Sequence, residues 1–229
     1  MTDDAPTDRD VPTDNDAPPD PDDDRSQRRT VRDGYDALAD DYGKSRDPPE
    51  APLVGSFLDS LPSGGRLLDV GCGQGTPVLD RLPAGVDAVG LDFSAEQLRR
   101  ARSATDAALL RADMTALPVA EGAVDAVTAL HSLVHVPVER HPAVIADFSR
   151  VTRPDGRLLL TASAEGWSGA NDDWLDGGTR MEWSFPGVER TREHLRDAGF
   201  EVVGEKLVRD ELAEEEGAWL FLTAEKRGD

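Results

Sequence analysis

Short apolar runs alternate with amphipathic segments over most of the chain. The apolar runs predict strands at residues 66–70, 86–91, 107–110, 124–130 and 157–161. Helical spacing of apolar positions predicts helices at 77–82, 94–101, 142–151 and 188–197. Two later runs, at 202–208 and 218–224, predict closing strands. Such alternation indicates an α/β fold with a doubly wound, mostly parallel sheet and right-handed crossovers.

The first 26 residues differ in composition from the rest, because Asp, Pro, Thr, Ala and Arg dominate them. Like charges repel and few apolar side chains are available there, so residues 1–26 are expected to form a disordered acidic tail. One domain is expected over residues 27–229. Its first element is predicted to be a helix, because Val31, Tyr35 and Leu38 recur at helical spacing.

A glycine-rich turn follows the first predicted strand, with the sequence LDVGCGQGT at residues 68–76. Glycines such as Gly71 and Gly73 let a ligand approach the backbone closely, because they carry no Cβ. Thr76 suits the N-cap of a following helix, whose unpaired N–H groups attract a nucleotide-like cofactor. The spacing is not that of the dinucleotide motif G-x-G-x-x-G, and Asp69 at the strand end favours a cationic ligand.

The segment 68–76 resembles motif I of the class I S-adenosylmethionine-dependent methyltransferases. Residues 35–42, YDALADDY, resemble a helix that caps the active site in many small-molecule members of that family. The resemblance extends over residues 27–225. It implies a Rossmann-like, seven-stranded sheet with one antiparallel strand near the C-terminus. It also implies S-adenosylmethionine as cofactor, S-adenosylhomocysteine as product and a small molecule as methyl acceptor.

Acidic residues follow the next two strands as well. Asp92 lies about twenty residues after the glycine turn, where a carboxylate commonly holds ribose hydroxyls. By resemblance, Asp69 lies near the ammonium group of the cofactor and Asp113 accepts from the adenine amino group. Phe93 and Met114 are expected to cover the two faces of the adenine. The residues expected to bind the cofactor are Asp69, Gly71, Gly73, Asp92, Phe93, Asp113, Met114 and Leu130.

Two histidines follow the fourth predicted strand, where an acceptor would approach the cofactor. His131 and His135 are therefore candidates for a general base, although a structural or substrate-lining role is also open. No other catalytic residue is indicated. His141 and His194 are expected at the surface.

The segment 164–186 departs most from a minimal fold of this kind, because tryptophans lie there among Gly, Ser and Asp. Aromatic residues in a polar loop at the ligand side of a sheet often line a pocket. The segment is expected to form a lid on the substrate side, or else a loop that its aromatic residues fasten to the domain. The candidate lid residues are Tyr35, Tyr42, Trp167 and Trp183.

The formal net charge of −21 opposes binding to nucleic-acid phosphates and to anionic membrane surfaces. Acid spread along a whole chain is typical of salt-adapted proteins, so a halophilic source is expected. The single cysteine, Cys72, excludes a disulfide within the chain, and the four histidines show no metal-ligand spacing. No metal and no membrane span are expected, and a cytoplasmic location is predicted.

Two other functions remain open from the sequence. A nicotinamide-dependent oxidoreductase or epimerase uses a similar sheet, but the glycine spacing differs and no Tyr-x-x-x-Lys pair is present. A non-catalytic protein that binds the same cofactor and regulates a partner is the other. The sequence indicates no oligomeric state.

Overall fold

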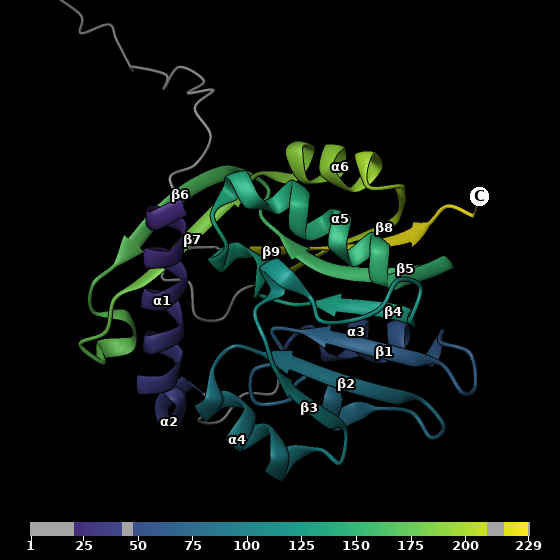
Figure 1. Ribbon diagram of the computed structural model, residues 1–229, viewed down its shortest axis with the longest axis horizontal. Coiled ribbons are helices and arrows are strands. Elements are labelled where there is room, and N and C mark those ends of the chain that lie inside the picture. Colours follow the sequence, from purple (N-terminus) through teal and green to yellow (C-terminus); the bar gives the residue numbers. More distant parts are fainter. Residues whose placement is uncertain (1–20, 43–47, 210–217, 229) are drawn as a thin grey trace, which may run out of the picture.

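The computed structural model describes residues 21–42, 48–209 and 218–228. A seven-stranded sheet in the order β3-β2-β1-β4-β5-β9-β8 crosses the domain (Figure 1). Strands β1 to β5 pair in parallel, whereas β9 is antiparallel to both of its neighbours. The structure thus confirms the predicted Rossmann-like sheet with one antiparallel strand near the C-terminus.

The elements follow the expected alternation along the chain. The strands of the large sheet are β1 (Arg66–Val70), β2 (Asp87–Asp92), β3 (Ala108–Arg111), β4 (Val124–Ala129), β5 (Thr152–Ala162), β8 (Phe200–Arg209) and β9 (Ala218–Lys226). The α-helices are α1 (Pro21–Ala37), α2 (Ala39–Tyr42), α3 (Ala51–Asp59), α4 (Ala95–Ala104), α5 (His141–Val151) and α6 (Val188–Asp197). Short 3-10 turns are η1 (Leu79–Arg81), η2 (Met114–Ala116), η3 (Leu133–His135), η4 (Val138–Arg140) and η5 (Trp174–Asp176).

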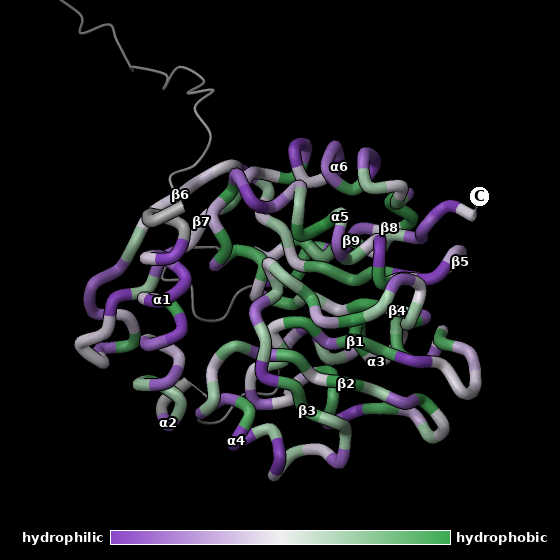
Figure 2. The backbone as a smooth tube through the Cα atoms, in the orientation of Figure 1, coloured by the Kyte–Doolittle hydropathy of each residue, from purple (hydrophilic) through white to green (hydrophobic). Residues whose placement is uncertain are grey.

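Both faces of the sheet are covered, so its central strands are largely buried, including polar residues such as Asp69 of β1 and Thr128 of β4. All six positions of β4 are buried. Adjacent residues of β1 point to opposite faces, and Leu68 joins a cluster with Phe148 of α5, whereas Leu67 joins a cluster with Phe57 of α3. Figure 2 shows the hydrophobic residues gathered along these strands and the hydrophilic ones on the outer helices.

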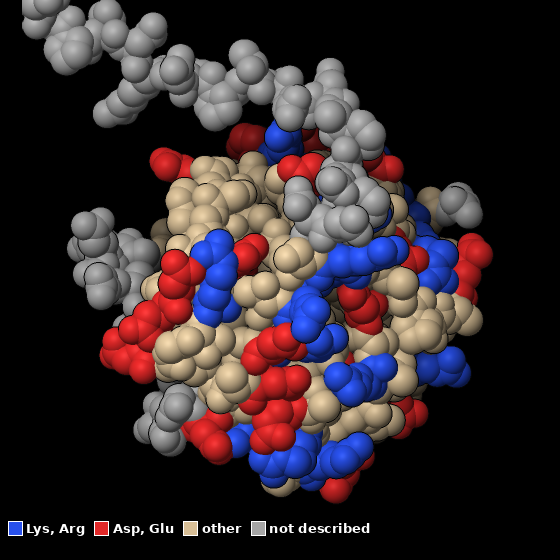
Figure 3. Space-filling view, turned by 60° about the vertical axis from the view of Figure 1, so that its left-hand side comes forward, with Lys and Arg blue, Asp and Glu red and all other residues tan. Residues whose placement is uncertain are grey.

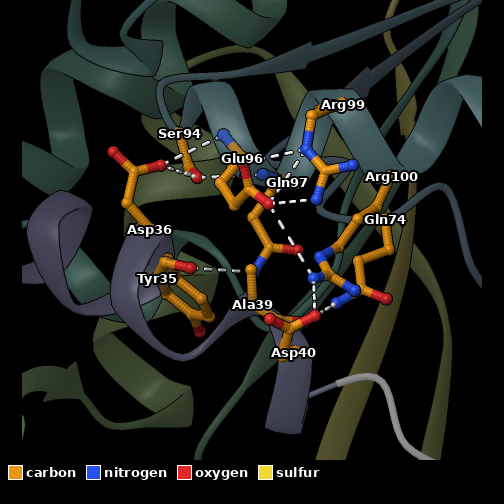
Figure 4. A network of polar contacts seen from close by, with 10 residues as sticks. All are labelled: Tyr35, Asp36, Ala39, Asp40, Gln74, Ser94, Glu96, Gln97, Arg99 and Arg100. Atoms are coloured by element: carbon orange, nitrogen blue, oxygen red, sulfur yellow. Dashed lines mark hydrogen bonds and ion pairs between the residues drawn. The ribbon is translucent and has the colours of Figure 1, made fainter.

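Helix α1 stands at the carboxyl ends of the parallel strands, beside a hairpin formed by β6 (Gly166–Asn171) and β7 (Met181–Pro186) (Figure 1). Polar contacts attach α1 to the start of α4 (Figure 4). The Asp36 carboxylate accepts from the Ser94 hydroxyl and from the Glu96 N–H, and Gln97 Nε2 donates to the Tyr35 carbonyl. The helix expected to cap the site therefore does lie across the ligand edge of the sheet.

The structure differs from the sequence predictions in four segments. Residues 77–82 form only the 3-10 turn η1, and the segment 164–186 forms the β6–β7 hairpin in place of an irregular loop. Strand β5 begins at Thr152, five residues before the strand predicted at 157–161, and its pairing with β4 is irregular in this added part. Helix α1 begins at Pro21, so the predicted boundary at residue 26 falls within it. Residues 1–20 of the expected tail lie outside the described part of the chain.

Candidate active site

The glycine turn places backbone and a buried carboxylate at the end of β1. Gly71 has φ of 72°, and a Cβ on it would lie 2.2 Å from the Ser132 Cβ, so only glycine fits there. Asp69 is 3% exposed and accepts from the Thr128 hydroxyl at 2.7 Å. Burial raises the pKa of Asp69 to about 7, although the hydrogen bond from Thr128 opposes that rise.

The helix expected directly after this turn is absent, and that prediction was wrong. Thr76 does not cap a helix, because its hydroxyl donates to the Asp80 carboxylate at 3.1 Å instead of accepting from a backbone N–H. The Asp80 N–H bonds to the Gly75 carbonyl five residues earlier, which is not the α-helical pattern. The site therefore offers loop N–H groups to a ligand, not the N-terminus of a helix at this turn.

Asp92, at the end of β2, is buried beside the glycine turn. One carboxylate oxygen accepts from the Gly73 N–H at 2.9 Å and the other from the Ser94 N–H at 2.8 Å. Burial raises the pKa of Asp92 to about 6, against the lowering effect of these two backbone hydrogen bonds. Each oxygen retains lone-pair capacity, so the carboxylate can still accept from ligand hydroxyls.

Asp113 follows β3 and is half-buried. Its Oδ1 accepts from the Thr115 N–H at 2.9 Å, and its Oδ2 accepts from Arg28 Nη1 of α1 at 2.6 Å. The same Arg28 nitrogen also donates to the Thr115 hydroxyl at 2.8 Å. Sequence reasoning missed Arg28, because no local motif connects it with a carboxylate that lies 85 residues further along the chain.

These carboxylates lie around two adjoining cavities. The first, which we call the strand-end cavity, is lined by Gly71, Gly73, Asp92, Phe93, Asp113, Met114 and Leu130, with Gln97 and Arg28. The second, which we call the aromatic basin, is lined by Asp69, Glu50, Tyr35, Trp167, Trp174, Trp183, Phe185 and Trp219. Both cavities share Tyr35, Gly71, Gly73, Leu130, His131 and His135. All eight residues expected to bind the cofactor therefore line one continuous site.

The donor set fits S-adenosylmethionine. The cofactor has a cationic amino-acid end, ribose hydroxyls and an adenine amino group, and the site has Asp69, Asp92 and Asp113 at successive strand ends. Gln97, which lines the strand-end cavity, adds a buried Oε1 that has no hydrogen-bond partner among the described residues. An unpaired buried acceptor next to a cavity suits a ligand donor.

The two candidate histidines differ in their surroundings. His135 is buried, with Nδ1 donating to the Glu182 carbonyl at 2.9 Å and Nε2 accepting from the Tyr35 hydroxyl at 2.8 Å. Burial lowers the pKa of His135 to about 4, which keeps the ring neutral. His131 is partly exposed, and its Nε2 donates to the Glu50 carboxylate at 3.1 Å.

Three of the four lid candidates, Tyr35, Trp167 and Trp183, line the aromatic basin. Tyr35 packs edge to face against Trp174, with ring centroids 5.8 Å apart, and Trp183 packs against both Trp174 and His135. Trp167 is 54% exposed and contacts Phe185. Tyr42 ends α2, and its side chain lies outside the described part of the structure.

Three further observations bear on the sequence predictions. Cys72 is buried, and burial raises the pKa of its thiol, so it acts as a small apolar residue of the turn. His141 is buried against the Val136 carbonyl, so its expected surface position was wrong; it opens α5 facing the core. His194 is half-buried on α6.

Over residues 21–42, 48–209 and 218–228, no group of three or more His, Cys, Asp and Glu side chains could hold a metal ion. None of the helices that the structure describes is both long enough and apolar enough to cross a bilayer.

The chain matches known proteins over most of its length. Residues 68–160 match the family model described as a methyltransferase domain. A 27-O-demethylrifamycin SV methyltransferase from Amycolatopsis mediterranei is 31% identical over 199 residues, which cover 73% of this chain and 72% of the relative. A tRNA (carboxymethyluridine(34)-5-O)-methyltransferase from Arabidopsis thaliana is 30% identical over 183 residues, but the match covers only 43% of that relative.

A solved structure agrees in fold. The 1,6-didemethyltoxoflavin-N1-methyltransferase from Burkholderia thailandensis, which was crystallised with S-adenosylhomocysteine, superposes with a TM-score of 0.71 over 93% of each chain at 20% identity. The glycine turn and the three strand-end carboxylates are consistent with this family. The match to the rifamycin methyltransferase, which covers more than two thirds of that relative, establishes it. The chain belongs to the class I S-adenosylmethionine-dependent methyltransferases.

Proposed function

We propose that this protein transfers the methyl group of S-adenosylmethionine to a small-molecule acceptor that binds in the aromatic basin. The observation that carries the proposal is the continuity of the two cavities. Asp69, Asp92 and Asp113 mark a binding site for the cofactor along the strand ends, and the basin adjoins it at His131 and His135. A donor and an acceptor bound in these cavities would meet at the shared residues.

The cofactor roles follow from the chemistry of each side chain. Bound S-adenosylmethionine supplies an electrophilic methyl group to the reaction. We assign its ammonium group to Asp69, its ribose hydroxyls to Asp92 and its adenine amino group to Asp113. Phe93 and Met114 line the same cavity and offer apolar surface to the adenine ring. In this assignment the protein holds the cofactor in one orientation, with its methyl group facing the aromatic basin.

A small molecule fits the charge of the chain better than an RNA. Acidic and basic side chains are interspersed over much of the face that carries α1 (Figure 3). The net charge of −21 repels phosphate backbones, unless salt screens it. The rifamycin methyltransferase, which is matched over more of its length than the tRNA methyltransferase, supports the same choice.

Methyl transfer from labelled cofactor tests the proposal. The protein is incubated with S-adenosylmethionine carrying a tritiated methyl group, together with either a small-metabolite extract or total tRNA, at matched salt. We expect label in the metabolite fraction only, and an Asp92→Ala control should remove it. Label in tRNA and none in metabolites would overturn the acceptor class, whereas label in neither fraction despite cofactor binding would favour the non-catalytic alternative.

A further inference from the structure

The aromatic basin gathers all four tryptophans of the chain, although they come from four separate elements. Trp167 and Trp183 lie on the β6–β7 hairpin, Trp174 in the turn between those strands, and Trp219 on β9. The cavity measures about 790 Å³ and includes Phe185 and Tyr35 in its lining. Aromatic walls on this scale favour a flat, polarisable ligand with rings of its own.

The aromatic rings contact one another in two groups. Tyr35, Trp174 and Trp183 form one group, with successive ring centroids 5.8 Å apart. Trp167, Phe185 and Trp219 form the other, with centroid distances of 5.8 and 5.7 Å. Edge-to-face and tilted packing restrains the side chains and leaves ring surface to line the cavity.

His131 stands at the junction of the basin and the strand-end cavity. Its ring packs edge to face against Trp219, with the two ring centroids 4.7 Å apart. Its Nε2 donates to the carboxylate of Glu50, a residue that is 7% exposed. A carboxylate that accepts from one ring nitrogen leaves the other nitrogen as the basic one and stabilises the ring once it is protonated. No hydrogen bond to His131 Nδ1 occurs within the described residues, so this nitrogen remains for a ligand.

His135 is unsuited to that task, although it also reaches both cavities. Both of its ring nitrogens already have protein partners, the Glu182 carbonyl and the Tyr35 hydroxyl. Burial also opposes its protonation. His135 instead orients Tyr35, while His131 alone of the two combines a free nitrogen with an orienting carboxylate.

We propose that the acceptor is a planar, conjugated hydroxyl compound of the phenol or enol class, and that His131 removes its proton while Glu50 holds the imidazole. This inference rests on the proposed function and adds the substrate class and the base. A cationic amine would also suit aromatic walls. Glu50, however, is engaged by His131, and an imidazole that is held by a carboxylate at one nitrogen and open at the other serves an acceptor that arrives protonated.

The step balances without a further reactant. The hydroxyl proton moves to His131 Nδ1, and an electron pair of the acceptor oxygen forms the bond to the methyl carbon. The electron pair of the broken carbon–sulfur bond stays on sulfur, which becomes a neutral thioether. The imidazolium, paired with Glu50, then returns its proton to solvent. Glu50 acts here as a positioning residue, since its role in the step is exerted through His131.

Binding of matched probes tests the substrate class. Tryptophan fluorescence of the full chain, saturated with S-adenosylhomocysteine, is titrated with 2-naphthol, 2-aminonaphthalene and the saturated decahydro-2-naphthol. We expect 2-naphthol to quench the fluorescence and to bind at least about tenfold more tightly than the saturated alcohol, because only the flat ring uses the aromatic walls. Equal binding of the two alcohols, or no binding of either, would overturn the substrate class.

The ionisation of bound 2-naphthol tests the base without any turnover, because the naphtholate absorbs at longer wavelength than the neutral form. In the dead-end complex with S-adenosylhomocysteine, we expect the pKa of 2-naphthol to fall by about one unit or more relative to water. His131→Asn should abolish the shift, and Glu50→Gln should reduce it. His194→Asn, on α6 outside both cavities, serves as control and should leave it unchanged.

Turnover completes the test. We expect His131→Asn to lower kcat for naphthol methylation about a hundredfold or more while the Kd for 2-naphthol changes little. An unshifted pKa of 2-naphthol in the wild-type complex, or methylation of 2-aminonaphthalene as fast as that of 2-naphthol, would overturn the assignment of His131 even if the variants fail to fold. Failure of S-adenosylhomocysteine to bind would instead overturn the proposed function, so the two outcomes are distinguishable.

Discussion

Arg28 Nη1 lies 2.6 Å from Asp113 Oδ2, so a helix near the start of the described chain is tied to the carboxylate that follows β3. The same helix is fastened to α4 through Asp36 and to the core of the basin through Tyr35 and His135. Helix α1 therefore covers the strand-end cavity, and a cofactor bound there would lie beneath it.

Removal of this anchor should loosen the cover. Arg28→Ala is expected to speed dissociation of S-adenosylhomocysteine about twofold to tenfold, since a partly exposed charged hydrogen bond contributes about 0.5–1.5 kcal/mol. Arg29→Ala is the matched control, because Arg29 is exposed on the same helix and pairs with Asp33. Stopped-flow displacement measures both rates. Slower release from Arg28→Ala, or equal effects of the two substitutions, would contradict a covering role for α1.

Asp92→Ala should weaken cofactor binding while the fold survives. Loss of a charged acceptor costs about 1.5–3 kcal/mol, which corresponds to a rise of about tenfold to a hundredfold in the Kd for S-adenosylhomocysteine. Asp87→Ala provides the control, because Asp87 begins the same strand and is exposed at the opposite end of the sheet. Calorimetric titration of both variants decides the matter, and an unchanged Kd in folded Asp92→Ala would remove Asp92 from the site.

Cofactor affinity should fall on acidification. Burial holds the pKa values of Asp69 and Asp92 at about 7 and about 6 in the free protein, whereas a bound ammonium group and ribose hydroxyls favour the ionised carboxylates. Binding therefore releases protons, and affinity is full above pH 7 and declines as the pH falls through about 7 and then about 6.

Calorimetry in buffers of different ionisation enthalpy measures the number of protons released. We expect Asp69→Asn to reduce that number and to flatten the pH profile near 7. Proton uptake on binding, or an affinity that rises as the pH falls, would show that these carboxylates do not carry the binding.

The hairpin should serve the acceptor more than the cofactor. Trp183→Ala is expected to raise the Kd of 2-naphthol about tenfold or more and to leave the Kd of S-adenosylhomocysteine nearly unchanged, because Trp183 lines only the aromatic basin of the two cavities. Trp167→Ala should affect thermal stability less than Trp183→Ala, since Trp167 is mostly exposed. A fall in Tm of Trp183→Ala with unchanged 2-naphthol affinity would show that the hairpin is only a structural fastening.

The sequence allowed the strand-end carboxylates to be predicted because each follows a short apolar run. In a parallel sheet the carboxyl ends of neighbouring strands meet at one edge, so Asp69, Asp92 and Asp113 had to lie near one another once the order of strands was assumed. Helix α4 agrees with the helix predicted at 94–101, and its N-cap Ser94 accepts from the Gln97 N–H.

Other parts of the site depend on contacts that no local pattern records. Glu50 and His131 are 81 residues apart, and Arg28 and Asp113 are 85 apart, so only the packed fold brings them together. Trp219 lies in a closing strand whose apolar pattern gave no sign of a ligand. The expected helix after the glycine turn failed because Thr76 found a side-chain partner in Asp80, which competes with capping.

The most direct test of the central claim is calorimetric titration of the full chain with S-adenosylhomocysteine and, separately, with NADH, both at high and at low salt. We predict saturable binding of one S-adenosylhomocysteine per chain and no detectable heat from NADH under either condition. Binding of NADH in the absence of S-adenosylhomocysteine binding would contradict the assignment of the strand-end cavity to this cofactor.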